Sequence, residues 1–283
     1  MTLQPRLDLP PLASIHTAWH DPWIITALAQ QGLTHYKLGR PTDDAHAVGG
    51  NDHAFWMILA DGVGSQPRSR HGSYVATQAV QAYFAHHTAN GQTPTTSLMR
   101  NAFAAAHLAI YQRAAAEQHT PETYAATLSA ILISGNNILA GSLGDSGIVA
   151  YSIHDEDDQP KSMITAFCSA PQPHPKTHSI IDPAWEDRLA VRPSQSPHIK
   201  ALVMATDGAF SFFLKDGEDT HSPFDPYYLD LIPAFVEQAT PRKFINFFAQ
   251  FLFENEADND DDRTLLIAYS PDQSATPPAP QSR

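Results

Sequence analysis

One stretch defines the core of this chain: Phe55-Trp56-Met57-Ile58-Leu59-Ala60-Asp61-Gly62-Val63-Gly64-Ser65. Five large apolar residues run without a polar break into Ala60 and then into Asp61-Gly62. An unbroken apolar run of this length, followed by turn residues, is typical of a strand that is buried on both faces. The carboxylate of Asp61 is therefore expected where a core strand ends and a loop begins, although an Asp-Gly pair after a strand is also a common hairpin turn.

The same pattern occurs twice more along the chain. Ala201-Leu202-Val203-Met204-Ala205-Thr206-Asp207-Gly208 ends an apolar run on Asp-Gly, and the segment 137–147 places Asp145 among glycines after another apolar run. Three buried strands that each end on an aspartate would bring their carboxylates together at one edge of the sheets. Clustered carboxylates repel one another unless they are protonated or neutralised by cations, and an all-oxygen ligand set favours Mg2+ or Mn2+.

Composition excludes several classes of partner. The chain has 283 residues and a formal net charge of −13, and the lack of a basic stripe argues against nucleic acid. No run approaches the roughly 20 apolar residues needed to span a bilayer, so no membrane partner is expected. The single Cys168 excludes an intramolecular disulfide, and Met1 to Pro11 lacks the pattern of a signal peptide. We therefore expect a cytoplasmic protein.

The predicted elements come in runs of one type rather than in alternation. After a strand near 23–29 and the strand before Asp61, we expect helices over 67–87 and 95–117, strands over 126–134, 137–143, 147–153 and 163–168, the strand before Asp207, helices over 226–238 and 241–253, and a final strand over 263–269. Such runs favour a layered α+β fold with helices outside two stacked sheets. Residues 1–13 are expected to be an N-terminal extension, and 271–283, rich in Pro, Ser and Gln, a disordered tail.

Five short motifs resemble those of the metal-dependent serine/threonine phosphatases, the PPM or type-2C family. They are Asp43-Asp44-Ala45-His46, Asp61-Gly62-Val63-Gly64, Gly144-Asp145-Ser146, Thr206-Asp207-Gly208 and Asp261-Asp262-Arg263-Thr264. Each motif is short and weakly specific by itself. The five nevertheless occur in the order and at the spacing of the family, which makes the combined resemblance strong.

The resemblance implies a four-layer αββα sandwich over residues 14–270, with two antiparallel sheets between layers of helices and two metal ions at the strand ends. By position, Asp61 would bridge both ions, and the carbonyl of Gly62 would bind one of them. Asp207 and Asp261 would hold the first ion. Asp44 would hold the second, directly or through its water shell.

The resemblance also implies a third, weaker metal site at Asp145, shared with Asp207. Two ions about 4 Å apart lower the pKa of a bound water and hold the phosphate oxygens. Water would then attack the phosphate in line, without a phosphoenzyme. Catalysis is expected to depend most on Asp61 and Asp207.

The sequence departs from the family pattern at several positions near the expected site. Gly39 stands where the family has its usual phosphate-binding arginine, and Arg40, one place further on, is the catalytic candidate for that role. His35 resembles the histidine that opens the first motif of a divergent bacterial subgroup. Asp262 stands where Asn is usual, and Val63 replaces a histidine that eukaryotic members use as a proton donor.

The basic residue that meets the phosphate is left open, because Arg68, Arg70 and His71 also follow the Asp61 loop. Retention of every acid in the pattern favours a Mg2+- or Mn2+-dependent phosphatase that acts on phosphoserine or phosphothreonine in a protein substrate and works as a monomer. The alternative is a catalytically weak relative that keeps the fold and serves as a binding or regulatory module.

Overall fold

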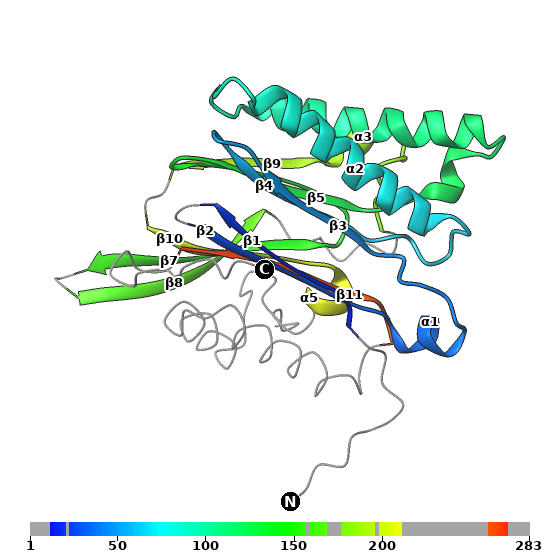
Figure 1. Cartoon of the computed structure of the whole chain (residues 1–283), viewed down its shortest axis with the longest axis horizontal. Coiled ribbons are helices and arrows are strands. Elements are labelled where there is room, and N and C mark those ends of the chain that lie inside the picture. The colour runs from blue at the N-terminus through cyan, green and yellow to red at the C-terminus, as the bar shows by residue number, and fades with distance from the viewer. Residues whose placement is uncertain are drawn as a thin grey trace, which may run out of the picture.

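The computed structural model describes residues 12–20, 23–156, 159–168, 177–195, 198–210 and 260–270. These residues form two antiparallel sheets that lie face to face, with two long helices over one of them (Figure 1). The first sheet has the order β1 (Leu12–His20), β2 (Trp23–Gln30), β11 (Arg263–Tyr269), β10 (Ile199–Ala205), β7 (Gly147–Glu156) and β8 (Gln159–Cys168). The second has the order β3 (Ala45–Gly50), β4 (Phe55–Ala60), β5 (Leu128–Ser134), β6 (Asn137–Leu143) and β9 (Ala190–Gln195).

Strand β4 is buried on both faces, as its unbroken apolar sequence predicts. Successive side chains of a strand point to opposite faces. Phe55, Met57 and Leu59 accordingly pack between the two sheets, whereas Trp56 and Ile58 pack under the helices. An apolar run without alternation is therefore what this position in the fold requires.

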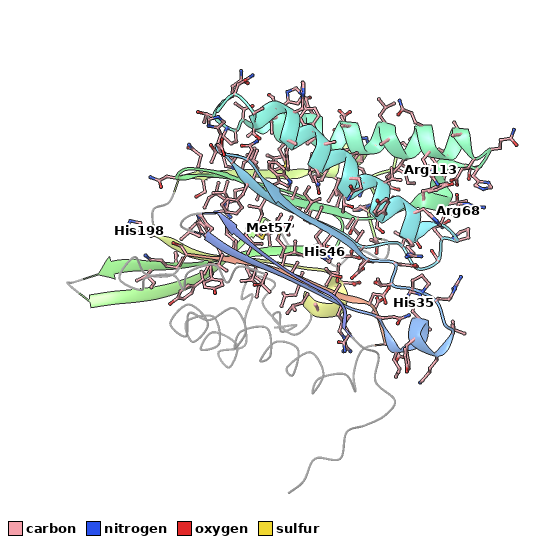
Figure 2. All side chains as sticks on the ribbon, viewed as in Figure 1. His35, His46, Met57, Arg68, Arg113 and His198 are labelled. Carbon is pink, nitrogen blue, oxygen red and sulfur yellow. The ribbon has the colours of Figure 1, made fainter. Side chains whose placement is uncertain are left out.

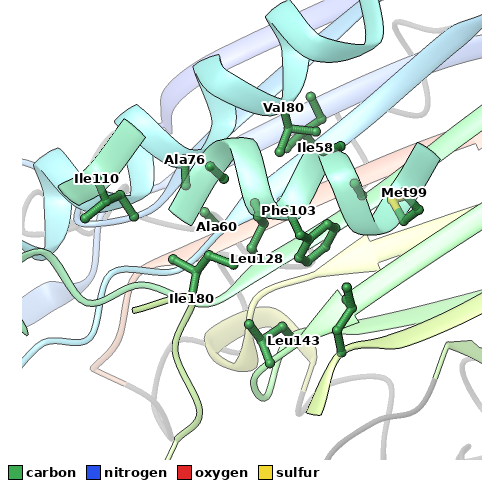
Figure 3. Close-up of a cluster of buried hydrophobic side chains, with 14 of the residues drawn as sticks. Ile58, Ala60, Ala76, Val80, Met99, Phe103, Ile110, Leu128, Leu143 and Ile180 are labelled. Carbon is green, nitrogen blue, oxygen red and sulfur yellow. The ribbon is translucent and has the colours of Figure 1, made fainter. Parts of the chain in front are cut away.

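Two helices cover the outer face of the second sheet (Figure 1). They are α2 (Ser69–Thr88) and α3 (Thr96–Ala116), close to the predicted ranges. The side chain of Thr95 accepts a hydrogen bond from the amide of Leu98 at 3.2 Å, which caps α3. Figure 3 shows Val80 and Phe103 among the buried apolar side chains that fill this layer.

The fold is the predicted α+β sandwich of two antiparallel sheets with helices. The expected helices over 226–238 and 241–253, which would complete the fourth layer, lie outside the described residues, as do residues 1–11 and the expected tail over 271–283. Among the described residues, no helix combines the length and the apolar character needed to cross a bilayer.

Several short elements were not predicted from the sequence. Strand β1 begins at Leu12, inside the expected extension. Strand β3 has the weakly apolar sequence Ala-His-Ala-Val-Gly-Gly and lies at a sheet edge. Strand β9 contains Pro193 and also lies at an edge, where a missing amide costs no ladder hydrogen bond. The helices α1 (Leu33–Lys37), α4 (Trp185–Arg188) and α5 (Asp207–Phe210) are each too short for their periodicity to be recognised.

Candidate metal centre

Three carboxylates meet where strands of both sheets end. Asp61 directly follows β4, Asp145 follows β6 after one glycine, and Asp207 begins α5 just after β10. One oxygen from each of these three side chains lies within 4.8 Å of those of the other two. The structure thus brings together three of the acids that the sequence motifs single out.

The backbone around Asp61 is fixed by a neighbouring strand. The Asp61 amide donates to Oγ1 of Thr127 at 3.0 Å, and the Thr127 amide donates to the Asp61 carbonyl at 2.8 Å. Gly62 forms an isolated bridge with Ala126. A Cβ at Gly62 would lie 2.7 Å from the carbonyl oxygen of Asp43, so glycine is needed for the Asp43-Asp44 segment to approach this closely.

Asp44 is buried between the ends of two strands of the other sheet. Its Oδ2 accepts hydrogen bonds from Oγ1 of Thr206 at 3.0 Å and from Oγ1 of Thr264 at 2.7 Å. The Thr264 amide in turn donates to Oγ1 of Thr206 at 3.0 Å. These two threonines hold one oxygen of Asp44, and the other, Oδ1, is buried with no hydrogen-bond partner in the described part of the chain.

The adjacent acids Asp261 and Asp262 have different surroundings. Asp261 is exposed, and its Oδ1 accepts the amide of Asp262 at 2.9 Å. Asp262 is 2% exposed and accepts hydrogen bonds from the amides of Gly32 and Asp43, each at 2.6 Å. Nδ1 of His35 lies 2.9 Å from Asp262 Oδ2. Asp262 is therefore held by three donors from the segment 32–43.

The electrostatics of the cluster favour a cation. Burial, followed by the charges of Asp44 and Asp207, raises the pKa of Asp61 well above its usual value. Burial and then the charge of Asp262 do the same for the pKa of Asp44, and burial and then the charge of Asp145 raise the pKa of Asp207. Among the described residues, no Lys or Arg forms an ion pair with any of these carboxylates.

The donor atoms left over fit a hard divalent cation. Oδ1 of Asp44, of Asp145 and of Asp207 is buried in each case and has no hydrogen-bond partner among the residues that the structure describes. Buried polar atoms normally have partners, and carboxylate oxygens are the ligands that Mg2+ and Mn2+ prefer. The residues present therefore fit the metal that the sequence motifs imply.

Two of the basic residues expected near the phosphate, Arg40 and Arg68, lie in different surroundings. Arg40 is exposed, and its guanidinium pairs with no acid among the described residues. The Arg40 amide donates to the carbonyl of His35 at 2.9 Å, which ties it to the α1 segment. Arg68 is half-buried beside the first turn of α2, and Figure 2 shows it at the same end of the molecule as His35.

A cleft of about 500 Å3 lies elsewhere, between α2 and the hairpin that joins β3 to β4. Its lining includes Gly49, Asn51, His53, Trp56 and Gln81 and shares no residue with the carboxylate cluster. The candidate chemistry therefore does not lie in this cleft.

Several supporting residues were not found by sequence reasoning. The hydroxyl of Thr177 donates to Oδ2 of Asp145 at 2.6 Å from a segment without clear periodicity, so no local pattern marked it. Thr206 and Thr264 lie inside the motifs, where alternation along their strands could have placed them facing Asp44. Thr127 lies in the strand expected over 126–134, but no side-chain role is predicted for it.

Two antiparallel sheets with a buried acidic cluster at their ends place the chain among α+β sandwich proteins with a carboxylate-lined centre. The sequence profile of the family described as protein phosphatase 2C matches residues 31–251. The chain belongs to that family. No curated protein sequence matches the chain.

Solved structures show the same fold at low sequence identity. A bacterial serine phosphatase is 17% identical with a TM-score of 0.59, and the match covers 87% of this chain and 97% of that one. The serine/threonine phosphatase Stp1 from Staphylococcus aureus is 16% identical with a TM-score of 0.59, covering 95% and 99% of the two chains. RsbX in complex with magnesium is 13% identical with a TM-score of 0.52, covering 90% and 99%.

Proposed function

We propose that this chain is a Mg2+- or Mn2+-dependent phosphatase that hydrolyses phosphoserine and phosphothreonine in protein substrates. The observation that carries the proposal is the cluster of Asp61, Asp145 and Asp207, in which buried oxygens lack partners and no basic side chain among the described residues compensates the charge. Family membership and the likeness to phosphatases whose names specify serine or threonine support it.

The motif positions assign a role to each acid. Asp61, the Gly62 carbonyl, Asp207, Asp261 and Asp44 would hold two ions. Divalent cations, when bound, supply a water of lowered pKa as the nucleophile and neutralise charge on the phosphoryl oxygens.

Asp145, near Asp207, would hold a third ion. The hydroxyl of Thr177 donates a hydrogen bond to one oxygen of the Asp145 carboxylate.

The chain's own residues supply rigid placement of these groups. Hydroxyls fix one oxygen of Asp44 and one of Asp145, and the other oxygen of each is buried and has no partner among the described residues. Backbone pairing with Thr127 fixes Asp61. Preorganised charges of this kind cost little reorganisation when charge develops in a reaction. We assign phosphate binding to Arg40, whose exposed side chain is not engaged by a described acid, and we propose a cytoplasmic signalling enzyme that works as a monomer.

The test is turnover of p-nitrophenyl phosphate and of a phosphothreonine peptide by the full chain, with Mn2+, with Mg2+ and with excess EDTA. Hydrolysis of both substrates that requires the metal is expected. Undiminished turnover in EDTA contradicts the metal requirement. Tight Mn2+ binding without turnover of either substrate would instead support the alternative, a binding module that keeps the fold and the metal centre.

A further inference from the structure

We infer that His35 and Asp262 act as one positioning pair that sets the Asp43-Asp44 segment and Asp261 in place. The inference rests on the proposed metal-dependent function and deepens it, because neither residue is assigned as a metal ligand. It also gives a joint reason for two departures from the family pattern, a histidine at 35 and an aspartate where asparagine is usual.

The side chain of Asp262 joins segments that are far apart in the sequence. Oδ1 accepts the amide of Gly32, the residue before α1, at 2.6 Å. Oδ2 accepts the amide of Asp43 at 2.6 Å and lies 2.9 Å from Nδ1 of His35. The side chain is 2% exposed, so water does not compete for these contacts.

This geometry requires a carboxylate at position 262. The two backbone amides bind different oxygens of the side chain, and an amide donor needs an acceptor. Asparagine offers one carbonyl oxygen and one NH2 group, which only donates. In either orientation an asparagine side chain at this position would place its NH2 against the amide of Gly32 or against the donors of Asp43 and His35. The aspartate therefore fits a site that an asparagine cannot satisfy.

His35 supplies the third hydrogen-bond donor to Asp262, and its ring lies between Asp262 and Asp43. Because a carboxylate only accepts hydrogen bonds, Nδ1 of His35 carries the hydrogen in the contact with Asp262. Nε2 of the same ring lies 3.8 Å from Oδ2 of Asp43. Asp43 also accepts a hydrogen bond from Oγ of Ser69 at 2.9 Å, so the pair connects α1 with the first turn of α2.

The consequence for the metal centre follows from chain connectivity. Asp262 binds the backbone amide of Asp43, and Asp44 is the next residue in the chain. The carboxylate of Asp44 accepts hydrogen bonds from the hydroxyls of Thr206 and Thr264. The Asp262 amide also donates to Oδ1 of Asp261. Loss of the contact between His35 and Asp262 would thus loosen Asp44 and Asp261, two of the acids proposed to bind metal. None of the proposed metal ligands would itself be substituted.

Two substitutions at one position separate positioning from general stability. The amide nitrogen of asparagine and Nδ1 of histidine are both attached to Cγ, so His35→Asn keeps a donor at the atom that faces Asp262. The amide of His35→Gln lies one bond further out, in the place of Nε2, and loses that contact. The experiment compares wild type, both His35 variants and Asp262→Asn. For each protein it measures the Mn2+ affinity by calorimetry, the melting temperature in EDTA, and turnover.

We expect His35→Gln and Asp262→Asn to weaken Mn2+ binding by about 10- to 100-fold, as losses of residues that orient metal ligands do. His35→Asn should stay within about 3-fold of wild type, a difference worth about 0.65 kcal/mol. Equal Mn2+ affinities of the Asn and Gln variants overturn the inference, as does a lower melting temperature in EDTA with unchanged Mn2+ affinity.

The outcome for wild type separates this inference from the proposed function. If wild type binds Mn2+ but does not hydrolyse either substrate, the proposed function fails, and the contrast between the Asn and Gln variants in calorimetry still decides the positioning role. If wild type binds no Mn2+, both are overturned.

Discussion

Replacing Asp61 by Asn should stabilise the metal-free protein and sharply lower turnover in the presence of Mn2+. The three clustered carboxylate oxygens lie within 4.8 Å of one another. Two unit charges at that distance repel by about 3 kcal/mol at an effective dielectric constant near 20 and by about 1 kcal/mol in bulk water. Asp61 makes two such pairs, with Asp145 and with Asp207, so removing its charge should raise the free energy of unfolding in EDTA by about 2 to 6 kcal/mol.

The pH dependence of this gain has a definite sign. The pKa of Asp61 in the folded metal-free protein is raised above its unfolded value by burial and then by the charges of Asp44 and Asp207. Between the two pKa values the folded state binds more protons than the unfolded state, so stability falls as the pH rises. The contribution of Asp61 to stability should be most favourable below the unfolded pKa, near 4, and should be lost as the pH rises toward the folded pKa. The gain from Asp61→Asn should be larger at pH 8 than at pH 5.

Urea unfolding in EDTA at both pH values measures the gain, and turnover with Mn2+ measures the activity. Turnover should drop by at least about 100-fold, the loss seen when one preorganised electrostatic group is removed from an active site. Asp187→Asn, at an exposed acid on α4, is the matched control and should change neither quantity. An Asp61→Asn variant that is less stable than wild type in EDTA but remains active would show that Asp61 only supports the turn after β4.

Three further changes test other parts of the centre. Asp145→Asn should lower turnover while leaving the Mn2+ affinity of the two tighter sites unchanged in calorimetry, and a titration resembling that of Asp61→Asn would contradict a separate third site. Thr264→Val removes the 2.7 Å hydrogen bond to buried Asp44 and should cost about 1 to 3 kcal/mol in urea unfolding; unchanged stability would mean that Asp44 finds another donor. A chain ending at Ser270 should unfold as cooperatively as the full chain, since β11 ends at Tyr269; a broadened transition or aggregation would show that residues 271–283 take part in the fold.

The sequence alone predicted the long, strongly patterned elements. The apolar runs before Asp61 and Asp207 are strands at the expected positions, and the periodic segments around Val80 and Phe103 are helices. The prediction worked because these segments are long enough for burial to dominate their composition. It missed β3 and β9, edge strands whose residues are half-buried or exposed at most positions, so that little apolar pattern is required of them.

The acids of the centre were visible in the sequence, but their support was not. Each acid follows a strand or begins a motif, which a linear pattern can show. The contacts of Asp262 with Gly32 and His35 span 230 and 227 positions along the chain, and no local pattern encodes them. The need for glycine at position 208 also comes from a distant residue, since a Cβ there would lie 2.0 Å from the carbonyl oxygen of Asp262.

The place of the polar cluster follows from the two-residue period of the strands. Residues 55, 57 and 59 of β4 face the space between the sheets, so Asp61 continues that face. By the same count Thr206 follows the inward residues 202 and 204 of β10, and Thr264 precedes the inward residues 266 and 268 of β11. At the same end of all three strands, the inward-facing position is therefore polar instead of apolar. Asp44 lies at this end, in contact with Thr206 and Thr264.

The apolar part of these inner faces offsets the repulsion at their ends. Phe55, Met57 and Leu59 are each at most 1% exposed, and burial of such side chains contributes about 1.5 to 3 kcal/mol apiece. Together with Leu202, Met204 and Leu266, which are fully buried on the inner faces of β10 and β11, these side chains supply roughly 9 to 18 kcal/mol, against about 10 kcal/mol for the three pairs that three ionised acids make at the cluster distance. The sheets can therefore pack with the acids facing one another before any cation binds. This ordering of magnitudes is the reason that removal of one acid is expected to stabilise the metal-free protein without changing its fold.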